Sequence, residues 1–305
     1  MKALVTGSAG FIGSHLVDAL LADPRYDRVI GVDNLSAGTL DNLSNALKNK
    51  NFTNVECDVC SKNIGELFEG VDVIFHEAAS KKNICLKDPH KDLEVNAGGT
   101  LNLLQNCIKH GVKKFVHAST GSVYGEPTVF PQTENHPLNP CSFYGVSKLA
   151  GERYVSMFNQ IYGLDTTILR YFHVFGSKQD NTQDKGGVVA IFMDRIKHDI
   201  PITVFGTGTQ ERSFTHVSDI VRANLFVSDK AKGETFNVAS GIKVSINKLI
   251  DYLELLNKKP CKVERDARLI GDIDRFDVSN DKLRKAGFKF KALFEGELIE
   301  MWRSL

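Results

Sequence analysis

The chain has 305 residues, with 38 lysine and arginine residues against 37 aspartate and glutamate residues and a net charge of +1. Hydrophobic residues make up 42% and charged residues 25%, as in an ordinary globular protein, which excludes collagen-like, coiled-coil and disordered chains. Because the charges balance, no general field would concentrate nucleic acid or an anionic membrane around the chain. An anionic partner is therefore expected to be small and bound locally.

The chain begins directly with strand-like residues, without the apolar stretch and cleavage site of a signal peptide. No apolar run approaches the roughly 18 residues that cross a bilayer, so we expect a cytoplasmic protein. The six cysteines are too scattered for a disulfide framework and are expected to be reduced. Cys57 and Cys60 form a CxxC pair with no second pair of ligands at similar spacing, so we predict no metal site.

Short β-branched runs alternate with amphipathic helical patterns through the first part of the chain. The predicted strands are residues 3–6, 28–32, 53–57, 71–75, 114–118 and 166–170. A crossover helix is predicted between the fourth and fifth strands by an apolar face made of Leu93, Ala97, Leu101, Leu104 and Ile108. These elements predict an open, doubly wound, parallel α/β sheet, with ligands at the carboxyl ends of its strands.

The alternation of strand-like and helical patterns becomes less regular after Gly176, where residues 177–187 are polar and rich in glycine, glutamine and aspartate. We therefore predict two domains. Residues 1–175 form the doubly wound domain, which also receives part of 214–240, and residues 176–305 mainly form a smaller, interleaved α/β domain that binds substrate.

A glycine-rich loop, TGSAGFIG at residues 6–13, follows the first strand and leads into an apolar helix. Glycines allow the backbone to approach a pyrophosphate, and the helix N-terminus supplies N–H groups. Asp33 closes the second strand about 20 residues later, where a carboxylate binds a ribose 2′-hydroxyl and repels a 2′-phosphate. The pattern predicts a Rossmann-type domain that binds NAD rather than NADP. Asp58, after the third strand, either contacts the adenine or caps a helix beginning near Ser61.

Tyr144 and Lys148 lie one turn apart at the start of a predicted helix and therefore share a face. A tyrosine acts as a base only when its pKa is lowered, which a nearby lysine ammonium together with an oxidised nicotinamide would achieve. Ser119 and Thr120 end the fifth strand, where their hydroxyls either reach a substrate or complete backbone hydrogen bonds.

Six motifs together resemble the extended short-chain dehydrogenase/reductase family, and within it the nucleotide-sugar 4-epimerases of the UDP-glucose and UDP-N-acetylglucosamine type. They are TGSAGFIG, Asp33, HEAA (residues 76–79), STGSVYG (119–125), YGVSK (144–148) and RYFHVFG (170–176). The resemblance covers essentially the whole chain. It implies NAD as cofactor and a UDP-hexose as substrate.

The resemblance also implies roles for individual residues. Tyr144 is the catalytic base and acid, Lys148 binds the nicotinamide ribose, and Thr120 bonds the 4-oxygen of the sugar. The implied cofactor contacts are Gly7, Gly10, Phe11, Ile12, Gly13, Asp33, Asn34, Ser36, Gly38, Asp58, Val59, Ala78, Ala79, Lys81, Asn96, Ser119, Tyr144, Lys148, Tyr171 and His173. The implied substrate contacts are Lys81, Thr120, Ser122, Tyr144, His173, Val188, Thr203, Phe205, Arg212 and Arg268.

The activity implied by the resemblance is epimerisation at C4 of UDP-glucose or UDP-N-acetylglucosamine through a 4-keto intermediate. His173 stands where related epimerases usually have asparagine, and Ser213 where they commonly have aspartate, so the pose of the substrate is expected to differ. Gly121 and Ser122 follow Thr120 in place of the Asp-Glu pair of the related dehydratases, which disfavours dehydration.

Other activities of the same family stay open: UDP-glucuronate 4-epimerase, decarboxylase or reductase, and a non-enzymatic NAD-binding protein. The helix carrying Leu93 to Ile108 and the one beginning near Tyr144 resemble the pair that forms a four-helix homodimer interface in the family. The sequence does not separate that arrangement from two ordinary helices that cover the sheet.

Overall fold

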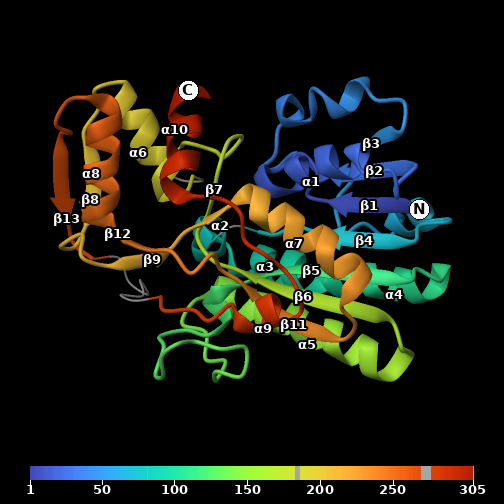
Figure 1. Cartoon of the computed structure of the whole chain (residues 1–305). Coiled ribbons are helices and arrows are strands. Elements are labelled where there is room, and N and C mark those ends of the chain that lie inside the picture. The colour runs from blue at the N-terminus through green and yellow to red at the C-terminus, as the bar shows by residue number, and fades with distance from the viewer. Residues whose placement is uncertain (81, 183–185, 269–275, 305) are drawn as a thin grey trace.

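The computed structural model describes residues 1–80, 82–182, 186–268 and 276–304. Its centre is a seven-stranded sheet in the order β11-β6-β5-β4-β1-β2-β3, with every neighbouring pair parallel (Figure 1). The predicted doubly wound α/β fold is therefore confirmed. The strands are β1 Lys2–Thr6, β2 Arg28–Asp33, β3 Phe52–Glu56, β4 Val73–His76, β5 Lys114–Thr120, β6 Asp165–Tyr171 and β11 Glu234–Val238.

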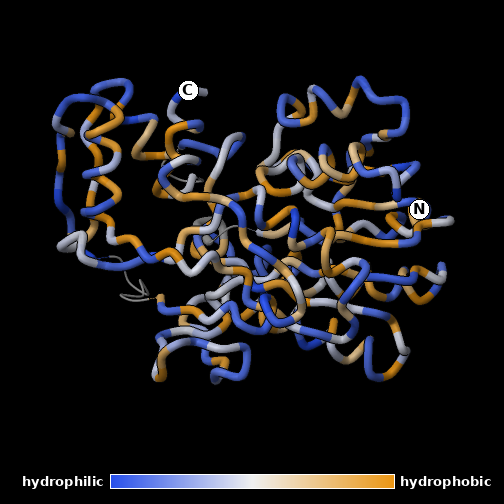
Figure 2. Tube along the Cα trace, viewed as in Figure 1, coloured by the Kyte–Doolittle hydropathy of each residue, from blue (hydrophilic) through white to orange (hydrophobic). Residues whose placement is uncertain are grey.

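Side chains of the central strands alternate between two cores, as the pleat of a sheet requires. In β1, for example, Val5 packs into a core with helices α1 and α7, whereas Leu4 packs into a second core with α4 and α5. Figure 2 shows hydrophobic residues along these strands and hydrophilic residues in the outer loops. The helices around the sheet are α1 Phe11–Ala22, α2 Lys82–Lys87, α3 Pro89–Leu93, α4 Thr100–His110, α5 Phe143–Tyr162, α7 Val217–Lys230 and α9 Asp281–Lys285.

All six predicted strands occur with ends shifted by at most two residues, and the predicted crossover helix is present but interrupted. A π-helical turn, Glu94–Gly99, separates α3 from α4. Ala97 and Leu104 of the predicted apolar face are buried, together with Leu103. Leu93 and Ile108, at the two ends of the predicted apolar face, are exposed.

The second half of the chain forms a separate hydrophobic core on the left of Figure 1, while α7 and β11 lie with the main sheet. In this core Phe294 packs against Phe175 and Phe214, with ring centroids 5.3 Å apart in both pairs. The division at residue 175 stays a prediction. The remaining elements are β7 Val174–Phe175, α6 Val188–Lys197, β8 Ile202–Phe205, β9 Glu211–Ser213, β10 Thr215–His216, β12 Lys243–Ser245, α8 Ile246–Asn257, β13 Val263–Asp266 and α10 Phe294–Ser304.

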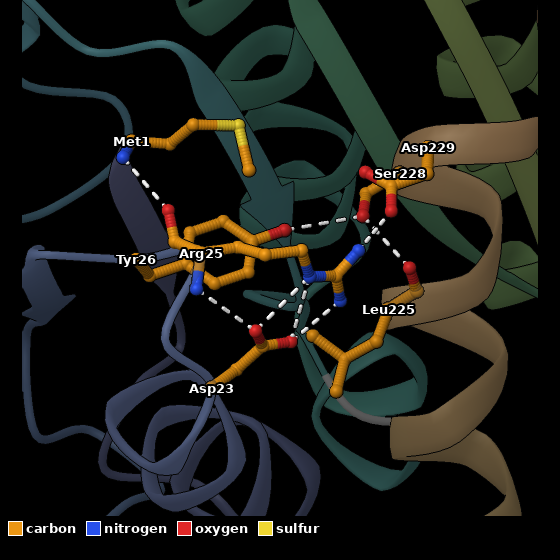
Figure 3. A network of polar contacts seen from close by, with 7 residues as sticks. All are labelled: Met1, Asp23, Arg25, Tyr26, Leu225, Ser228 and Asp229. Carbon is orange, nitrogen blue, oxygen red and sulfur yellow. Dashed lines mark hydrogen bonds and ion pairs between the residues drawn. The ribbon is translucent and has the colours of Figure 1, made fainter.

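Polar contacts fasten α7 to the turn between α1 and β2 (Figure 3). The guanidinium of Arg25 binds Asp23, two residues earlier in the chain, and Asp229 near the end of α7. The hydroxyls of Tyr26 and Ser228 lie 3.1 Å apart. These contacts join segments that are about 200 residues apart in sequence and hold α7 on the sheet.

None of the helices in the described ranges is long and apolar enough to cross a bilayer.

A buried ion pair ties β6 to α5 behind the carboxyl ends of the strands. Arg170 Nη2 lies 2.7 Å from Glu152 Oε2, and both side chains are about 5% exposed or less. Ser119 Oγ donates to the same carboxylate at 2.6 Å, and Arg170 Nη1 donates to the Tyr124 hydroxyl at 2.8 Å. Because both charges are paired and hydrogen-bonded, their burial is tolerated.

We expect Arg170→Ala to lower the free energy of unfolding by about 3–5 kcal/mol, because Glu152 is then buried without its cation. Arg303→Ala is the control, since the pair Arg303–Glu300 is 70% exposed on both sides. It is expected to cost less than about 1 kcal/mol. Urea denaturation measures both variants, and equally small losses would contradict the structural role of the buried pair.

Candidate active site

The glycine-rich loop is shaped by close packing that side chains would prevent. Gly7 has φ +68°, and a Cβ atom there would lie 2.7 Å from the backbone nitrogen of Ala78. A Cβ atom on Gly13 would lie 2.1 Å from the carbonyl oxygen of Gly7. The loop therefore presents its backbone and the N-terminus of α1 at the carboxyl edge of the sheet, an arrangement that suits a phosphate.

A cavity of about 380 Å³, here called the cofactor cavity, opens beside this loop at the ends of β1, β2 and β4. Many of the predicted cofactor residues line it: Gly7, Gly10, Phe11, Ile12, Gly13, Asp33, Asn34, Ser36, Gly38, Asp58, Val59, Ala78 and Ala79. Its volume and shape suit a ligand bound at the point where the strand order reverses, between β1 and β4.

Asp33 ends β2 and is held by two backbone N–H groups. Its Oδ2 accepts from Ala9 at 2.9 Å, and its Oδ1 accepts from Leu35 at 2.8 Å. A carboxylate has about four lone-pair sites, so acceptors remain for ribose hydroxyls. The fixed negative charge in the cavity favours the ribose of NAD over the 2′-phosphate of NADP.

From the sequence, Asp58 is expected either to contact the adenine or to cap a helix beginning near Ser61. It lines the cofactor cavity, and its carboxylate accepts from Cys60 N at 2.9 Å and from Asn34 Nδ2 at 2.8 Å. Burial opposes its charge, but these hydrogen bonds outweigh burial and lower the pKa of Asp58. The helix expected near Ser61 is wrong, because the next helical turn begins at Ile64.

The first turns of α5 place Tyr144 and Lys148 on one face. Ser142 caps this helix by accepting a hydrogen bond from Gly145 N at 3.1 Å. Lys148 is 2% exposed, and within the described part of the chain its ammonium makes no hydrogen bond or ion pair. Burial lowers the pKa of Lys148 to about 8, against the opposing charges of Glu77, Glu152 and Asp92. A buried ammonium without a partner suits a hydroxyl-bearing ligand such as a ribose.

Tyr144 interacts with Thr120 at the end of β5. Burial raises the pKa of Tyr144, and the hydrogen bond with Thr120 only partly opposes this. The protein residues alone therefore do not produce the lowered pKa expected from the sequence, since desolvation of the phenolate dominates. Thr120 also accepts from Ser122 N at 3.1 Å and donates to Ser122 Oγ at 3.2 Å. Thr120, Ser122 and Tyr144 are thus brought together.

Three other predicted cofactor residues have polar groups that bind protein atoms. Ser119 donates its hydroxyl to Glu152, and the Tyr171 hydroxyl donates to Glu77 at 2.8 Å. Asn96 is fully buried in the π-helical turn, where its Oδ1 accepts from Ser80 N at 2.8 Å. The structure places these side chains as supports of the cavity wall, and their direct contact with a cofactor stays a prediction.

The predicted substrate residues of the second half lie on several elements. Arg212 on β9 is 7% exposed and lies over the ring of Phe276, with 5.7 Å from Cζ to the centroid. His173 packs edge-on against the same ring at 4.6 Å and has φ +35°, in the left-handed region that asparagine tolerates well. Val188 begins α6, and Thr203 and Phe205 lie on β8.

Two further predictions fall at the edge of what the structure describes. Arg268 follows β13 and is exposed, with its Cβ 3.9 Å from the position of a Cβ on Gly206. Lys81, and the segment that follows Arg268, lie outside the described residues. Ser213 is buried on β9, and Arg212 beside it donates to the carbonyl of Glu211 at 2.9 Å.

Sequence reasoning missed two residues of this region, Glu77 and Phe276. Glu77 lines the cofactor cavity and binds Tyr171. A charged residue directly after a buried strand, at the edge where ligands bind, was the signal that could have found it. Phe276 lies more than 60 residues beyond Arg212, and nothing in its local sequence indicates that the two meet.

The comparisons with known proteins agree with this geometry. Residues 3–239 match the model of the NAD dependent epimerase/dehydratase family. The chain belongs to this family. It is 41% identical over 256 residues to a putative UDP-glucose 4-epimerase of Methanocaldococcus jannaschii, covering 82% of this chain and 81% of that protein.

Solved structures extend the likeness to the whole chain. The UDP-glucose 4-epimerase of Thermotoga maritima with UDP-glucose is 36% identical and matches with a TM-score of 0.94, covering 99% of this chain and 98% of that one. The UDP-glucose 4-epimerase of Thermus thermophilus in complex with NAD is 33% identical, with a TM-score of 0.91 and coverage of 99% and 98%. The protein is an NAD-dependent enzyme, and the cavity residues fit that cofactor.

Asp33→Asn tests the selectivity of the cavity. Removing the charge is expected to weaken NAD binding about 10-fold and to strengthen NADP binding by a similar factor, since the repulsion of the 2′-phosphate is lost. Equilibrium dialysis with each nucleotide measures both effects. Asp27→Asn, at a side chain that is 81% exposed, is the charge control. An unchanged ratio of NAD to NADP affinity in Asp33→Asn would contradict the assignment.

Proposed function

We propose that the enzyme epimerises C4 of a UDP-hexose, converting UDP-glucose and UDP-galactose, or their N-acetyl forms, through a transient 4-keto sugar. The observation that carries this proposal is the pairing of Tyr144 and Thr120 beside the buried, unpaired Lys148. Thr120 ends β5, a strand of the same parallel sheet whose carboxyl edge carries the cofactor cavity, in a member of the epimerase/dehydratase family. The named relatives support the 4-epimerase activity.

In this proposal each residue has one task. When bound, NAD supplies a reversible acceptor for the hydride at C4. Tyr144 takes the proton of the 4-hydroxyl and later returns it, while Thr120 holds the same oxygen by a hydrogen bond. Lys148 donates to the nicotinamide ribose and supplies positive charge beside Tyr144. The buried position of Lys148 limits the access of water, which protects the keto sugar until the hydride returns to its other face.

The second half of the chain suits a nucleotide diphosphate. Arg212 carries a guanidinium fork, a geometry that binds phosphate oxygens in pairs, and its Cζ lies 5.7 Å from the centroid of the Phe276 ring. Phe205 and Thr203 on β8, and Val188 on α6, are proposed to hold the uracil, and Arg268 to add a second cation. A firmly held diphosphate leaves the hexose able to turn over in the pocket, as epimerisation requires.

Dehydration is disfavoured because no acid follows Thr120. Ser122, two residues after Thr120, hydrogen-bonds to Thr120 through its backbone N–H and its hydroxyl. Elimination of water across C5 and C6 needs an acid and a base there, and a serine hydroxyl supplies neither at neutral pH. UDP-glucuronate stays an open substrate, so it belongs in the assay.

The cytoplasmic location expected from the sequence stays a prediction.

Proton NMR of the sugar tests the proposal with purified enzyme, and Tyr144→Phe tests the base. The wild-type enzyme is expected to equilibrate UDP-glucose with UDP-galactose, or the N-acetyl pair, without added NAD. Tyr144→Phe is expected to lose at least about 10³-fold in kcat while keeping NAD, because the proton acceptor is gone. Tyr162→Phe, at an exposed tyrosine of the same helix, is the control. Full activity in Tyr144→Phe would contradict the role of the base.

We also propose a homodimer that pairs α4 and α5 with the same helices of a second copy. The outer face of α5 exposes Val146, Tyr154, Met157 and Ile161 at helical spacing. Leu93 and Ile108 are exposed on the adjacent π-interrupted helix, and the two helices share one core on their inner sides. Exposed apolar residues on two neighbouring helices suit a self-complementary, twofold interface.

Ile161→Asp is expected to convert the dimer into a monomer, because the charge would be buried at the interface. Light scattering after size exclusion gives the mass directly. Leu255→Asp, at a residue of α8 that is 74% exposed, is the control and should leave the mass unchanged. A monomeric wild-type enzyme would overturn this proposal without affecting the assignment of the active site.

A further inference from the structure

One wall of the cofactor cavity comes from the second half of the chain. Gln179 and Asp180 line the cavity, whereas the other lining residues all fall between residues 7 and 95. Residues 177–180, here called the strap, follow β7 and are all polar. The proposed mechanism gives the strap no task. Because Gln179 shares the cavity with Gly10 and Gly13 of the glycine-rich loop, the strap lies beside the place expected for a pyrophosphate.

The strap is fastened to α1 through the side chain of Lys178. Its Nζ lies 2.7 Å from Oδ2 of Asp18 and donates to the backbone carbonyl of Asn42 at 2.9 Å. The side chains of Lys178 and Asp18 are 24% and 35% exposed, so the ion pair is partly shielded from solvent. The backbone of Lys178 has φ +61°, a left-handed conformation that a lysine keeps only where surrounding contacts hold it.

A second contact joins the strap to the same face of α1. His15 lies three residues before Asp18, and this spacing puts the two side chains on one side of the helix. His15 Nε2 lies 2.9 Å from the carbonyl oxygen of Ser177. Because a carbonyl oxygen can only accept, this nitrogen carries the proton. The helix that begins at the glycine-rich loop therefore holds the strap at two successive residues.

Asn42 connects the lysine to the glycine-rich loop itself. It lies in the 3₁₀ turn Leu40–Leu43, and its Nδ2 donates to the carbonyl of Ala9 at 2.9 Å. The backbone carbonyl of the same residue accepts from Lys178. One ammonium thus joins the strap, α1 and a turn that is bonded to the loop.

The side chain of Gln179 is held between two neighbouring segments. Its Nε2 donates to the carbonyl of Val174 in β7 at 3.0 Å. A Cβ atom on Gly187 would lie 2.6 Å from that nitrogen, so the backbone before α6 packs directly against the amide. With Lys178 bonded to α1, the next residue stays at the cavity wall.

We propose that Lys178 is a positioning residue whose ion pair with Asp18 holds the strap along the cofactor cavity and slows the release of bound NAD. The inference goes beyond the proposed function and rests on NAD as the cofactor. Release requires the strap to move away from α1, which breaks the bonds of the ammonium to Asp18 and Asn42. A partly exposed ion pair contributes modestly, so its loss is expected to change the release rate several-fold.

The rate of NAD release from the holoenzyme tests the inference without any sugar. Excess ADP-ribose is added to fill emptied sites, and the NAD left on the protein is measured over time after rapid gel filtration. Lys178→Met keeps the length of the side chain but loses its charge, and it is expected to release NAD about 5-fold faster than wild type. Lys178→Arg is expected to restore slow release, because the cation returns.

A double-variant cycle separates the ion pair from a general weakening of the fold. Asp18→Asn is expected to speed release by itself but to add nothing to Lys178→Met, because both changes remove the same interaction. Lys113→Met is the matched control. Lys113 Nζ also lies 2.7 Å from a carboxylate, that of Asp72, and both residues directly precede strands, at the opposite edge of the sheet. This variant should release NAD at the wild-type rate.

Three results would overturn the inference: a wild-type rate in Lys178→Met, an equal acceleration in Lys113→Met, or a further acceleration when Asp18→Asn is added to Lys178→Met. Failure of the 4-epimerase assay would leave this outcome unaffected, because no sugar is present.

Discussion

The buried charge of Lys148 is the constraint on which the rest of the site depends. Removing an ammonium from water costs several kcal/mol unless other groups compensate. Glu152, one helical turn further along α5, is paired with Arg170, and the cofactor cavity opens at the carboxyl edge of the same sheet. The parallel sheet matters to function because the carboxyl ends of its strands bring the glycine-rich loop, Asp33 and Thr120 to one edge.

The fold and the cofactor end of the site could be predicted because their signals are local. A glycine must lie at residue 7, where φ is positive and Ala78 packs against the backbone, and such a glycine is visible in the sequence. Asp33 was found because its place at the end of β2 follows from spacing. Tyr144 and Lys148 were found because one helical turn separates them. In each case the residues that determine the geometry are close together in the chain.

The parts that escaped prediction depend on contacts between distant segments. The π-helical turn at Glu94–Gly99 interrupts a helix whose sequence has ordinary helical spacing. Asn96 hydrogen-bonds to Ser80 and Tyr171 to Glu77, and residue spacing does not reveal these partners. The pKa of Tyr144 is set by burial, which residue spacing does not reveal.

Tyr144 and Lys148 are proposed to serve a reversible hydride transfer at C4 of a nucleotide sugar. The most direct test is to supply UDP-glucose carrying deuterium at C4 and to examine the epimer by NMR. The product is expected to keep the deuterium at C4, because the hydride leaves and returns within one closed site. Replacement of the deuterium by hydrogen from solvent would contradict it.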